Sequence, residues 1–230
     1  PCFFAEPNEG GTKLFIHVPT VGERINLGSK LDEWIRNRSK SICFGDTWKN
    51  LLSNKLIAES AFQVDKASSS ITLELDINKN GDITNWEFYL SSIKPISLIS
   101  REHLDTLHKR KKGSRTIPAK LKSIKTSISN LETILFISEL INKRLTESGL
   151  IQLDQDIPNI NNLYDLSITP PGLDLDGWMP SFSCTKPESI INLLTKYSNI
   201  ILTLHFKSLD IESINLSKQL QESFQVNDII

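Results

Sequence analysis

Hydrophobic and polar residues alternate through much of the first hundred positions, a pattern with a period of two that is typical of strands. It is clearest over Ser70–Ile77, and it predicts a half-buried strand there. Asn80-Gly81 follows at once and predicts a two-residue hairpin turn. The return strand is expected to place Trp86, Phe88 and Leu90 on one face. A shorter apolar stretch, Lys13–Val18, predicts a further strand.

Other segments carry helical spacing and helix-capping residues. Ser29 is a suitable N-cap for a helix near Leu31–Ser39, with Asp32 at the capping-box position. After Ser100 the period changes, and a short helix is expected around Leu104 and Leu107. A long helix is then expected, with Pro118 in its first turn and Gly149 at its end. Its apolar positions are Leu121, Ile124, Ile128, Leu131, Leu135, Ile141 and Leu145. A last helix is expected to begin at Pro187.

These elements predict an α/β (α+β) fold in which a mixed sheet with a hairpin is followed by long helices. We expect one domain over residues 1–208, sheet-rich over 1–99 and helix-rich over 100–208. Residues 154–187, rich in Asn, Asp, Pro and Gly, predict irregular structure within it. Residues 209–230 form a polar C-terminal tail.

Composition restricts the possible partners. Of the 230 residues 39% are hydrophobic, which is enough for a real core, and the net charge of −1 gives no global attraction to nucleic acid or membrane. No apolar run is long enough to span a bilayer. Three cysteines without metal-ligand spacing fit a reducing compartment, so we expect a cytoplasmic protein without a membrane partner. The chain has no initiating methionine, and we expect a piece of a longer protein or a processed product.

One concentrated basic run offers a local site for a polyanion. It contains Lys109, Arg110, Lys111, Lys112 and Arg115. Clustered, mobile cations bind phosphates because contact releases counterions, so single-stranded RNA is one candidate partner. A solvated loop between two helices is the alternative, since most charge runs are of that kind.

Residues 76–87 fit the formula of an EF-hand calcium loop. The ligand positions would be Asp76, Asn78, Asn80, Asp82 and Glu87. An EF-hand needs an amphipathic helix entering the loop, whereas the residues before Asp76 have the period of a strand. We therefore favour the hairpin and keep calcium binding as the minor alternative.

Single chemistry-bearing residues do not add up to a catalytic motif. His17 lies on an apolar strand and is expected to be a satisfied core or edge histidine. Cys43 has no histidine partner that would make it a nucleophile. Arg36 and Arg38 lie two apart and do not share a helix face, so at most one is expected to pair with a structural acid. Four tryptophans could stack bases, although alternation favours a core position for Trp86; they are Trp34, Trp48, Trp86 and Trp178. No catalytic residue and no metal ligand is assigned.

Residues 14–46 resemble one stretch of the catalytic domain of the ribonuclease II/R exoribonucleases, the RNB family. Members usually show an apolar strand, a glycine-serine-x-leucine-aspartate turn, and an arginine-rich helix that runs into serine-valine-tyrosine-leucine-proline. The matching residues are Leu14–Val18, Gly28–Asp32, Arg36, Arg38 and Ser41–Asp46. The likeness continues more weakly over residues 3–208, and the sequence at Leu56–Glu59 is most similar to the cyanobacterial and plastid branch.

The resemblance implies processive 3′→5′ degradation of single-stranded RNA at a Mg²⁺ site held by a cluster of aspartates. That cluster is expected just upstream of Phe3 and therefore outside this chain. The fold that it implies is a partial RNB-type catalytic domain.

The chain departs from the family pattern at positions that would be functional. A family aspartate falls at Thr20, a base-stacking tyrosine at Cys43, a stacking phenylalanine at Leu153, and a helix glutamate near Asn192. These losses support a second hypothesis, a catalytically degenerate RNA-binding or scaffold module. In either case we expect these 230 residues alone not to cleave RNA.

Overall fold

The computed structural model describes residues 1–44, 47–111, 114, 116–147 and 187–211. The chain divides into two compact units. The first contains Pro1–Val18, Phe62–Gln152 and Cys184–Ile230, and the second contains Pro19–Ala61 and Leu153–Ser183. Each unit is described by itself.

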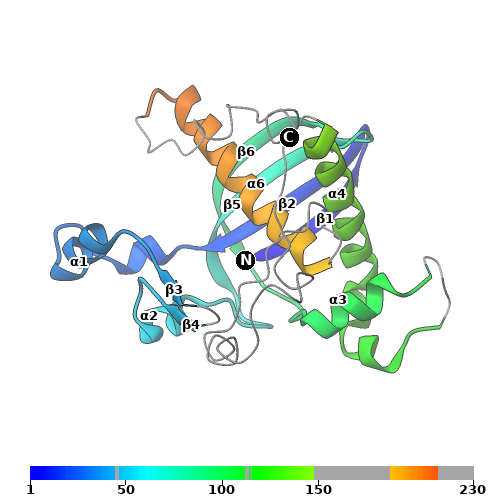
Figure 1. Ribbon diagram of the computed structural model, residues 1–230, viewed down its shortest axis with the longest axis horizontal. Helices are drawn as coiled ribbons and strands as arrows, with labels where there is room; N and C mark the ends of the chain where they lie inside the picture. The colour runs from blue at the N-terminus through cyan, green and yellow to red at the C-terminus, as the bar shows by residue number, and fades with distance from the viewer. Residues whose placement is uncertain (45–46, 112–113, 115, 148–186, 212–230) are drawn as a thin grey trace, which may run out of the picture. The chain divides into compact units, whose positions relative to one another are not determined.

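A four-stranded sheet in the order β1-β2-β5-β6 forms the centre of the first unit (Figure 1). The strands are β1 (Cys2–Asn8), β2 (Gly11–Pro19), β5 (Ser68–Asn78) and β6 (Ile83–Ile93). The sheet is antiparallel, whereas the sequence pattern led us to expect a mixed one. The expected strands over Lys13–Val18 and Ser70–Ile77 are present, and β1 is an additional strand that pairs with β2.

The β5–β6 hairpin is present but has a longer loop than the sequence predicted. Asn78 N–H donates to Asp82 O and Gly81 N–H to Asn78 O, so the loop is Lys79-Asn80-Gly81. Gly81 has φ +86°, and the strand register shifts at Asp76/Ile77. A three-residue loop that ends in a left-handed glycine and a bulge is a common hairpin form. The prediction for the return strand holds at Trp86 and Phe88, which pack on the core, whereas Leu90 is 72% exposed.

Helices follow the sheet in the predicted order, with one difference. The elements are α3 (Arg101–His108), the 3-10 helix η2 (Ala119–Ser127), α4 (Ile128–Glu147) and α6 (Pro187–Ser208). The single long helix expected from Pro118 is divided, because Ile124 has non-helical torsions (φ −114°, ψ 23°). Pro118 therefore begins a 3-10 segment, and the regular α-helix starts ten residues later.

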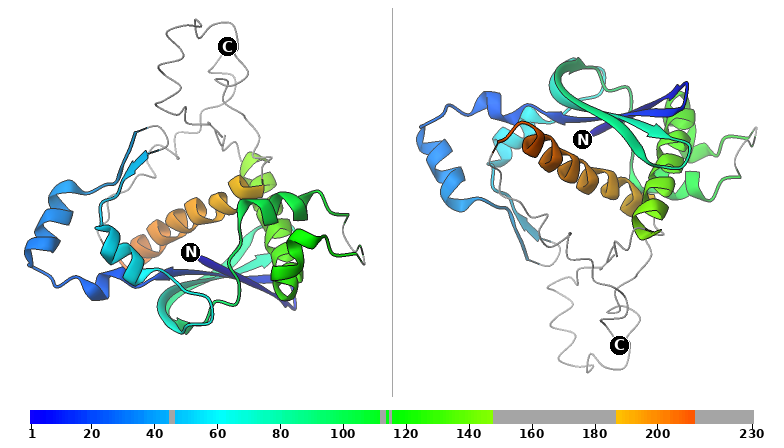
Figure 2. Two further views of the ribbon diagram at one scale, coloured as in Figure 1. Left: turned by 90° about the horizontal axis from the view of Figure 1, so that it is seen from below. Right: turned by 90° about the horizontal axis from the view of Figure 1, so that it is seen from above.

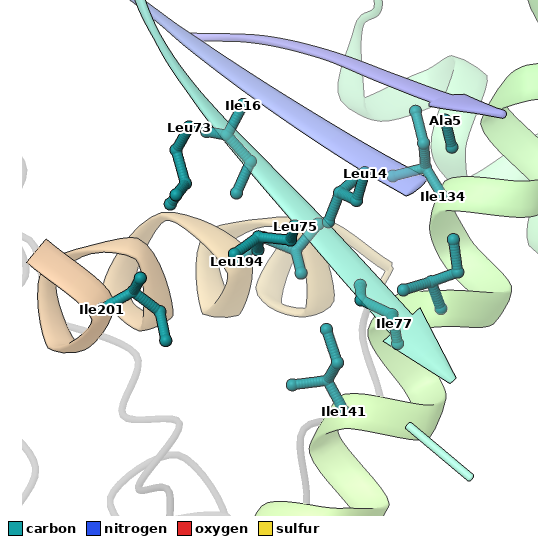
Figure 3. Packing of buried hydrophobic residues seen from close by; sticks show 11 residues of the cluster. Ala5, Leu14, Ile16, Leu73, Leu75, Ile77, Ile134, Ile141, Leu194 and Ile201 are labelled. Carbon is teal, nitrogen blue, oxygen red and sulfur yellow. The ribbon is translucent and has the colours of Figure 1, made fainter. Parts of the chain in front are cut away.

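Helices α4 and α6 lie on the same face of the sheet (Figure 2). The sheet contributes one alternating set of apolar side chains to the core beneath them (Figure 3). From the strands these are Ala5, Leu14, Ile16, Leu73, Leu75 and Ile77, and from the helices Ile134, Ile137, Ile141, Leu194 and Ile201. A second cluster joins α3, η2 and α4 through Leu104, Leu107, Leu121, Ile124, Ile128, Leu131 and Leu135.

The second unit holds shorter elements. They are η1 (Val21–Arg24), α1 (Lys30–Arg38), β3 (Ile42–Phe44), β4 (Thr47–Lys49) and α2 (Asn54–Ser60). The predicted cap of α1 is confirmed, because Ser29 Oγ accepts a hydrogen bond from Asp32 N–H at 3.2 Å. The Asp32 carboxylate accepts from Gly28 N–H at 2.9 Å, one residue earlier than in a capping box.

Some sequence predictions fall on residues outside the described ones. They concern Gly149, the segment 154–187, and the tail beyond residue 211. In the described part of the chain, no helix is long and apolar enough to cross a membrane.

The hairpin loop should be sensitive to a side chain at Gly81. A Cβ at this position would lie 3.0 Å from both the carbonyl carbon and the oxygen of Leu140 in α4, at a φ of +86°. Gly81→Ala should therefore lower the free energy of unfolding by about 1–3 kcal/mol, measured by urea denaturation. Gly10→Ala is the control, because its Cβ would meet nothing within 4 Å. Equal stability of the two variants would show that the loop does not pack on α4.

Candidate functional site

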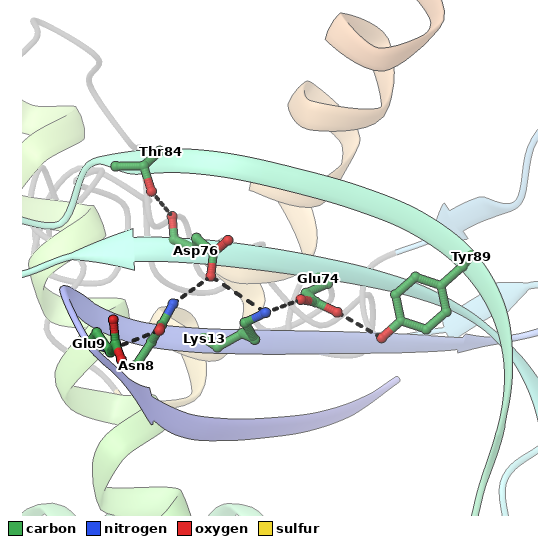
Figure 4. A network of polar contacts seen from close by, with 7 residues as sticks. All are labelled: Asn8, Glu9, Lys13, Glu74, Asp76, Thr84 and Tyr89. Atoms are coloured by element: carbon green, nitrogen blue, oxygen red, sulfur yellow. Dashed lines mark hydrogen bonds and ion pairs between the residues drawn. The ribbon is translucent and has the colours of Figure 1, made fainter.

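Polar side chains cover the sheet face opposite the core. Alternation along β2 and β5 places Lys13 and Glu74 on this face, because their neighbours Leu14 and Leu75 lie in the core. Lys13 forms an ion pair with Glu74 and lies 3.8 Å from Asp76. Tyr89 Oη donates to Glu74 at 3.0 Å, so the network crosses three strands (Figure 4). The hydrogen bond to Glu74 raises the pKa of Lys13, which keeps the lysine charged.

A chain of hydroxyl groups continues from His17 across the same face. His17 Nδ1 lies 2.8 Å from Thr72 Oγ1, which lies 2.6 Å from Ser91 Oγ. Ser70 Oγ is a further 2.7 Å from Ser91 Oγ. Thr72 and Ser70 are fully buried, so each hydroxyl must find its partner within the protein. Burial lowers the pKa of His17. His17 is therefore the satisfied histidine that its place on an apolar strand predicted.

An aromatic stack extends this face onto the edge strand. The rings of Phe15 and His17 are stacked, with centroids 6.3 Å apart, and Phe4 lies 5.9 Å from Phe15. Carboxylates dominate the charge around them, because Glu74 and Asp76 outnumber Lys13. We therefore assign this face a structural role in holding the strands in register rather than a role in binding a polyanion.

The hairpin loop uses its EF-hand-like residues for other contacts. Asn78 Oδ1 accepts from the N–H groups of Asn80 and Asp82, and its amide donates to Asp82. Asp82 Oδ1 pairs with Arg144 Nε at 2.6 Å. Hydrogen bonds from Asn78 and Arg144 lower the pKa of Asp82.

Asp76 accepts from Asn8 at 3.0 Å and lies opposite Asn85 in the hairpin. Glu87 lies on the return strand β6, opposite Glu74. Both sides of the loop are strands, whereas an EF-hand would require a helix entering it. The prediction of a hairpin over these residues is confirmed.

Arg110, at the centre of the basic run, holds the loop after α3 together. Its side chain is 11% exposed and pairs with Glu132 of α4 at 2.8 Å. The same guanidinium donates to the backbone carbonyls of Ser114 and Thr116. A guanidinium shared in this way fixes the loop on α4, so Arg110 has few donors left for a phosphate.

Lys109 and Lys111 are exposed and form no ion pair with any residue in the described part of the chain. Lys109 lies on the wall of an open hollow of about 550 Å³ between α3 and η2. Lys120 on the same wall is paired with Glu102. Lys112 and Arg115 lie outside the described residues. Within one basic run, Arg110 thus has a structural role, whereas Lys109 and Lys111 could contact a polyanion.

The candidate arginines of α1 have different partners. Arg36 pairs with Asp32 at 3.1 Å, whereas Arg38 lies over the ring of Trp34. Among the described residues, only one of the two arginines therefore pairs with an acid, as expected. Thr20 donates its hydroxyl to Glu23 at 3.0 Å. Positions Cys43, Leu153 and Asn192 carry no described side chain.

The described part of the chain offers no set of residues that fits a Mg²⁺ site. Hard divalent cations require several oxygen ligands, mainly carboxylates. Within the ranges that the structure describes, no group of three or more His, Cys, Asp or Glu residues could hold a metal ion. No step of a reaction is therefore derived through a metal for this chain.

The RNB domain model matches residues 2–230. The match includes almost every residue, and the chain belongs to the RNB-domain family. No curated protein matches its sequence at a significant level, so the cyanobacterial and plastid branch stays a prediction.

Solved structures of RNase R from Mycoplasma genitalium share the fold. The complex with ribose-methylated single-stranded RNA has a TM-score of 0.67 at 15% identity, over 91% of this chain and 30% of that one. The apo form gives 0.67 at 16% identity with the same coverage. The complex with double-stranded RNA gives 0.66 at 15% identity, over 91% of this chain and 35% of that one. The chain spans about a third of the length of these proteins.

Two features of the site were missed in the sequence analysis. The polar ladder from Lys13 to Tyr89 could have been found, because the polar residues of β5 alternate as strictly as the apolar ones. The structural role of Arg110 could not have been found from the sequence, because its partner Glu132 is 22 residues away and no local pattern links the two.

Stability should depend on the protonation of His17. Its folded-state pKa lies below the ordinary value of 6.5 because burial disfavours the charged ring. The unfolded chain therefore binds the proton more readily, and the contribution of His17 is complete above pH 6.5 and is lost as the pH falls through the folded-state pKa. Urea unfolding should show a loss of stability from pH 7.5 to pH 5.5 that is smaller in His17→Gln.

The control for this experiment is His108→Gln, a change of an exposed histidine. It should keep the pH dependence of the wild type. A wild-type slope in His17→Gln would contradict the assignment.

Proposed function

We propose that this chain is part of a cytoplasmic RNB-family 3′→5′ exoribonuclease that acts on single-stranded RNA. In this proposal the metal-binding aspartates lie outside these 230 residues. The observation that carries the proposal is the match of the RNB domain to residues 2–230. The shared fold with RNase R over 91% of the chain supports it.

The pairing of β1 with β2 is consistent with this proposal. Cys2 lies opposite His17, so the start of β1 is next to the end of β2 that leads to Thr20. The family resemblance implies aspartates just before Phe3 and at the position of Thr20. The hairpin register puts Cys2 and His17, which lie close in sequence to these two positions, at the same end of the sheet.

In this proposal, catalysis and RNA binding are carried out by different groups. When bound, Mg²⁺ would supply the activated hydroxide and stabilise charge on the phosphate. The described residues offer cations for the RNA backbone, and we propose Lys109 and Lys111 as contacts. Lys112 and Arg115 continue the same run and are included in the proposal. Arg110 serves as the residue that positions the loop.

The alternative function is that of a catalytically degenerate RNA-binding or scaffold module. The observation that favours it is the residue at position 20. A family aspartate falls at Thr20, whose hydroxyl is bonded to Glu23 and which cannot act as an anionic metal ligand. Both functions include RNA binding, and they differ in whether the full-length protein hydrolyses RNA.

RNA binding through the basic run should be visible in its salt dependence. The double variant Lys109→Gln/Lys111→Gln should bind a labelled single-stranded oligoribonucleotide more weakly. For two lost phosphate contacts, the slope of log K against log[salt] should decrease by about 1.4. Fluorescence anisotropy from 20 to 200 mM salt measures both quantities.

A matched control removes two lysines elsewhere. Lys94 and Lys143 are exposed and pair at 3.8 Å with Asp65 and Glu147, so Lys94→Gln/Lys143→Gln changes net charge equally. This variant should keep the wild-type slope. Equal losses in both double variants would show that binding follows net charge and not the basic run.

The purified chain should not cleave RNA, because the family resemblance implies that the metal-binding aspartates lie upstream of Phe3. Incubation of the 230 residues with a 5′-labelled oligoribonucleotide and Mg²⁺, followed by denaturing electrophoresis, should show intact substrate. Cleavage that EDTA abolishes would place a complete active site within the chain and overturn the division proposed here.

A further inference from the structure

Helix α1 carries a partly exposed tryptophan whose ring is in contact with an arginine. Trp34 is 47% exposed, and the guanidinium carbon of Arg38, one turn later, lies 5.2 Å from the centre of its ring. This distance is within the range of a cation–π contact. Arg38 Nη2 also donates to the backbone carbonyl of Lys49 at 3.2 Å, so the guanidinium is held in place over the indole.

Nothing in the described part of this unit buries the indole. Helix α1 has no buried residue, and between positions 19 and 61 no residue with a described burial is buried. Leu31, on the same helix face three residues before Trp34, is 39% exposed. The helix is instead held by polar contacts, which are the Ser29 cap and the Asp32–Arg36 pair. Among the described residues of this unit, Trp34 is therefore not part of a buried core.

Along α1, acidic residues precede this ring and basic residues follow it. Asp32 and Glu33 occupy the first turn, and Arg36 and Arg38 the last. Lys40 and Lys49 are exposed beyond the C-terminal end, and neither forms an ion pair with a described residue. The helix dipole explains why the arginines lie in the last turn. It does not explain an exposed indole beneath one of them.

We propose that Trp34 and Arg38 form a stacking platform for a base of single-stranded RNA, with Lys40 and Lys49 binding the adjoining phosphates. A flat aromatic face with nearby cations is the arrangement by which proteins bind single strands without reading their sequence. An indole already ordered by a guanidinium loses little freedom when a base stacks on it. The inference rests on the proposed function, because it names a second place on the same chain where RNA is bound.

A protein partner would require different surroundings. Protein interfaces are depleted in lysine at their centre, whereas Lys40 and Lys49 lie beside Arg38, and the acids of α1 are at the opposite end. The charge of this surface therefore favours a polyanion over an apolar protein segment.

The experiment compares RNA binding by the whole 230-residue chain and by single variants. Trp34→Ala should weaken binding of a fluorescein-labelled oligouridylate by about 5–150-fold, the range that loss of one stacked base gives. Trp34→Phe should recover most of this loss. A duplex of the same length should bind equally well to wild type and Trp34→Ala, because its bases are not free to stack.

A matched control separates stacking from charge. Arg24 lies in the same unit, is 49% exposed and pairs with Glu59 at 3.8 Å. Arg38→Gln should weaken oligouridylate binding more than Arg24→Gln does. Equal effects of the two changes would overturn the platform, since binding would then follow net charge.

Crosslinking gives a readout that a structural role of Trp34 would not produce. Irradiation of the complex with 5-bromouridine-containing RNA should yield an adduct at Trp34, identified by mass spectrometry. Wild-type binding without an adduct and without weakening in Trp34→Ala would overturn the platform and leave the RNA function intact. If the wild-type chain binds no RNA at low salt, the proposed function itself fails for this chain.

Circular dichroism spectra should confirm that the variants fold. Should Trp34→Ala not fold, the comparison of Lys40→Glu with Lys30→Glu decides the question. Lys40 lies at the platform and Lys30 at the far end of α1, so only Lys40→Glu should weaken binding. Equal binding by these two variants would overturn the proposal.

Discussion

The first unit depends on helix α4, which provides apolar side chains to two cores at once. Ile134, Ile137 and Ile141 pack against the sheet. The second core takes Ile128, Leu131 and Leu135 from the same helix. Each set follows i, i+3, i+7 spacing, and the two stripes lie about 120° apart around the helix axis. A helix with one apolar stripe could cover the sheet or bind α3 and η2, but not both.

Between the two stripes, α4 has room for only a small residue. Ser138 lies one helical turn beyond both Ile134 and Leu135, and it is fully buried. Its hydroxyl donates to the carbonyl of Ile134 at 2.7 Å, so this polar group needs no partner from outside the helix. Asn130 of the same helix donates to Ala5 O on the edge strand β1 at 2.5 Å, which occupies a backbone group that would otherwise be unpaired. The polar residues of α4 thus complete contacts that its apolar stripes bring together.

The sequence predicted the elements whose pattern is local and failed where a distant contact decides the structure. Strict alternation identified β5, and Ser29 and Pro187 mark the starts of their helices as expected. The helical spacing from Leu121 to Leu145 combined two separate stripes into one, which concealed both the break at Ile124 and the double role of α4. The hairpin loop has three residues instead of two, and Gly81 lies against the backbone of Leu140, a contact 59 residues away that the local sequence does not reveal.

The sequence is equally limited in predicting which charged side chains can bind a ligand. Five cations in the basic run are equivalent by composition, but Arg110 is paired with Glu132, whereas Lys109 forms no ion pair with a described residue. In α1, two arginines with the same local surroundings differ for a similar reason, because Arg36 meets Asp32 and Arg38 meets an indole. A cation that already has a partner contributes little to a polyanion, so a basic run overstates the surface that RNA can use. The charge pattern of this chain indicates a possible ligand, and the pairing of individual side chains decides where that ligand can bind.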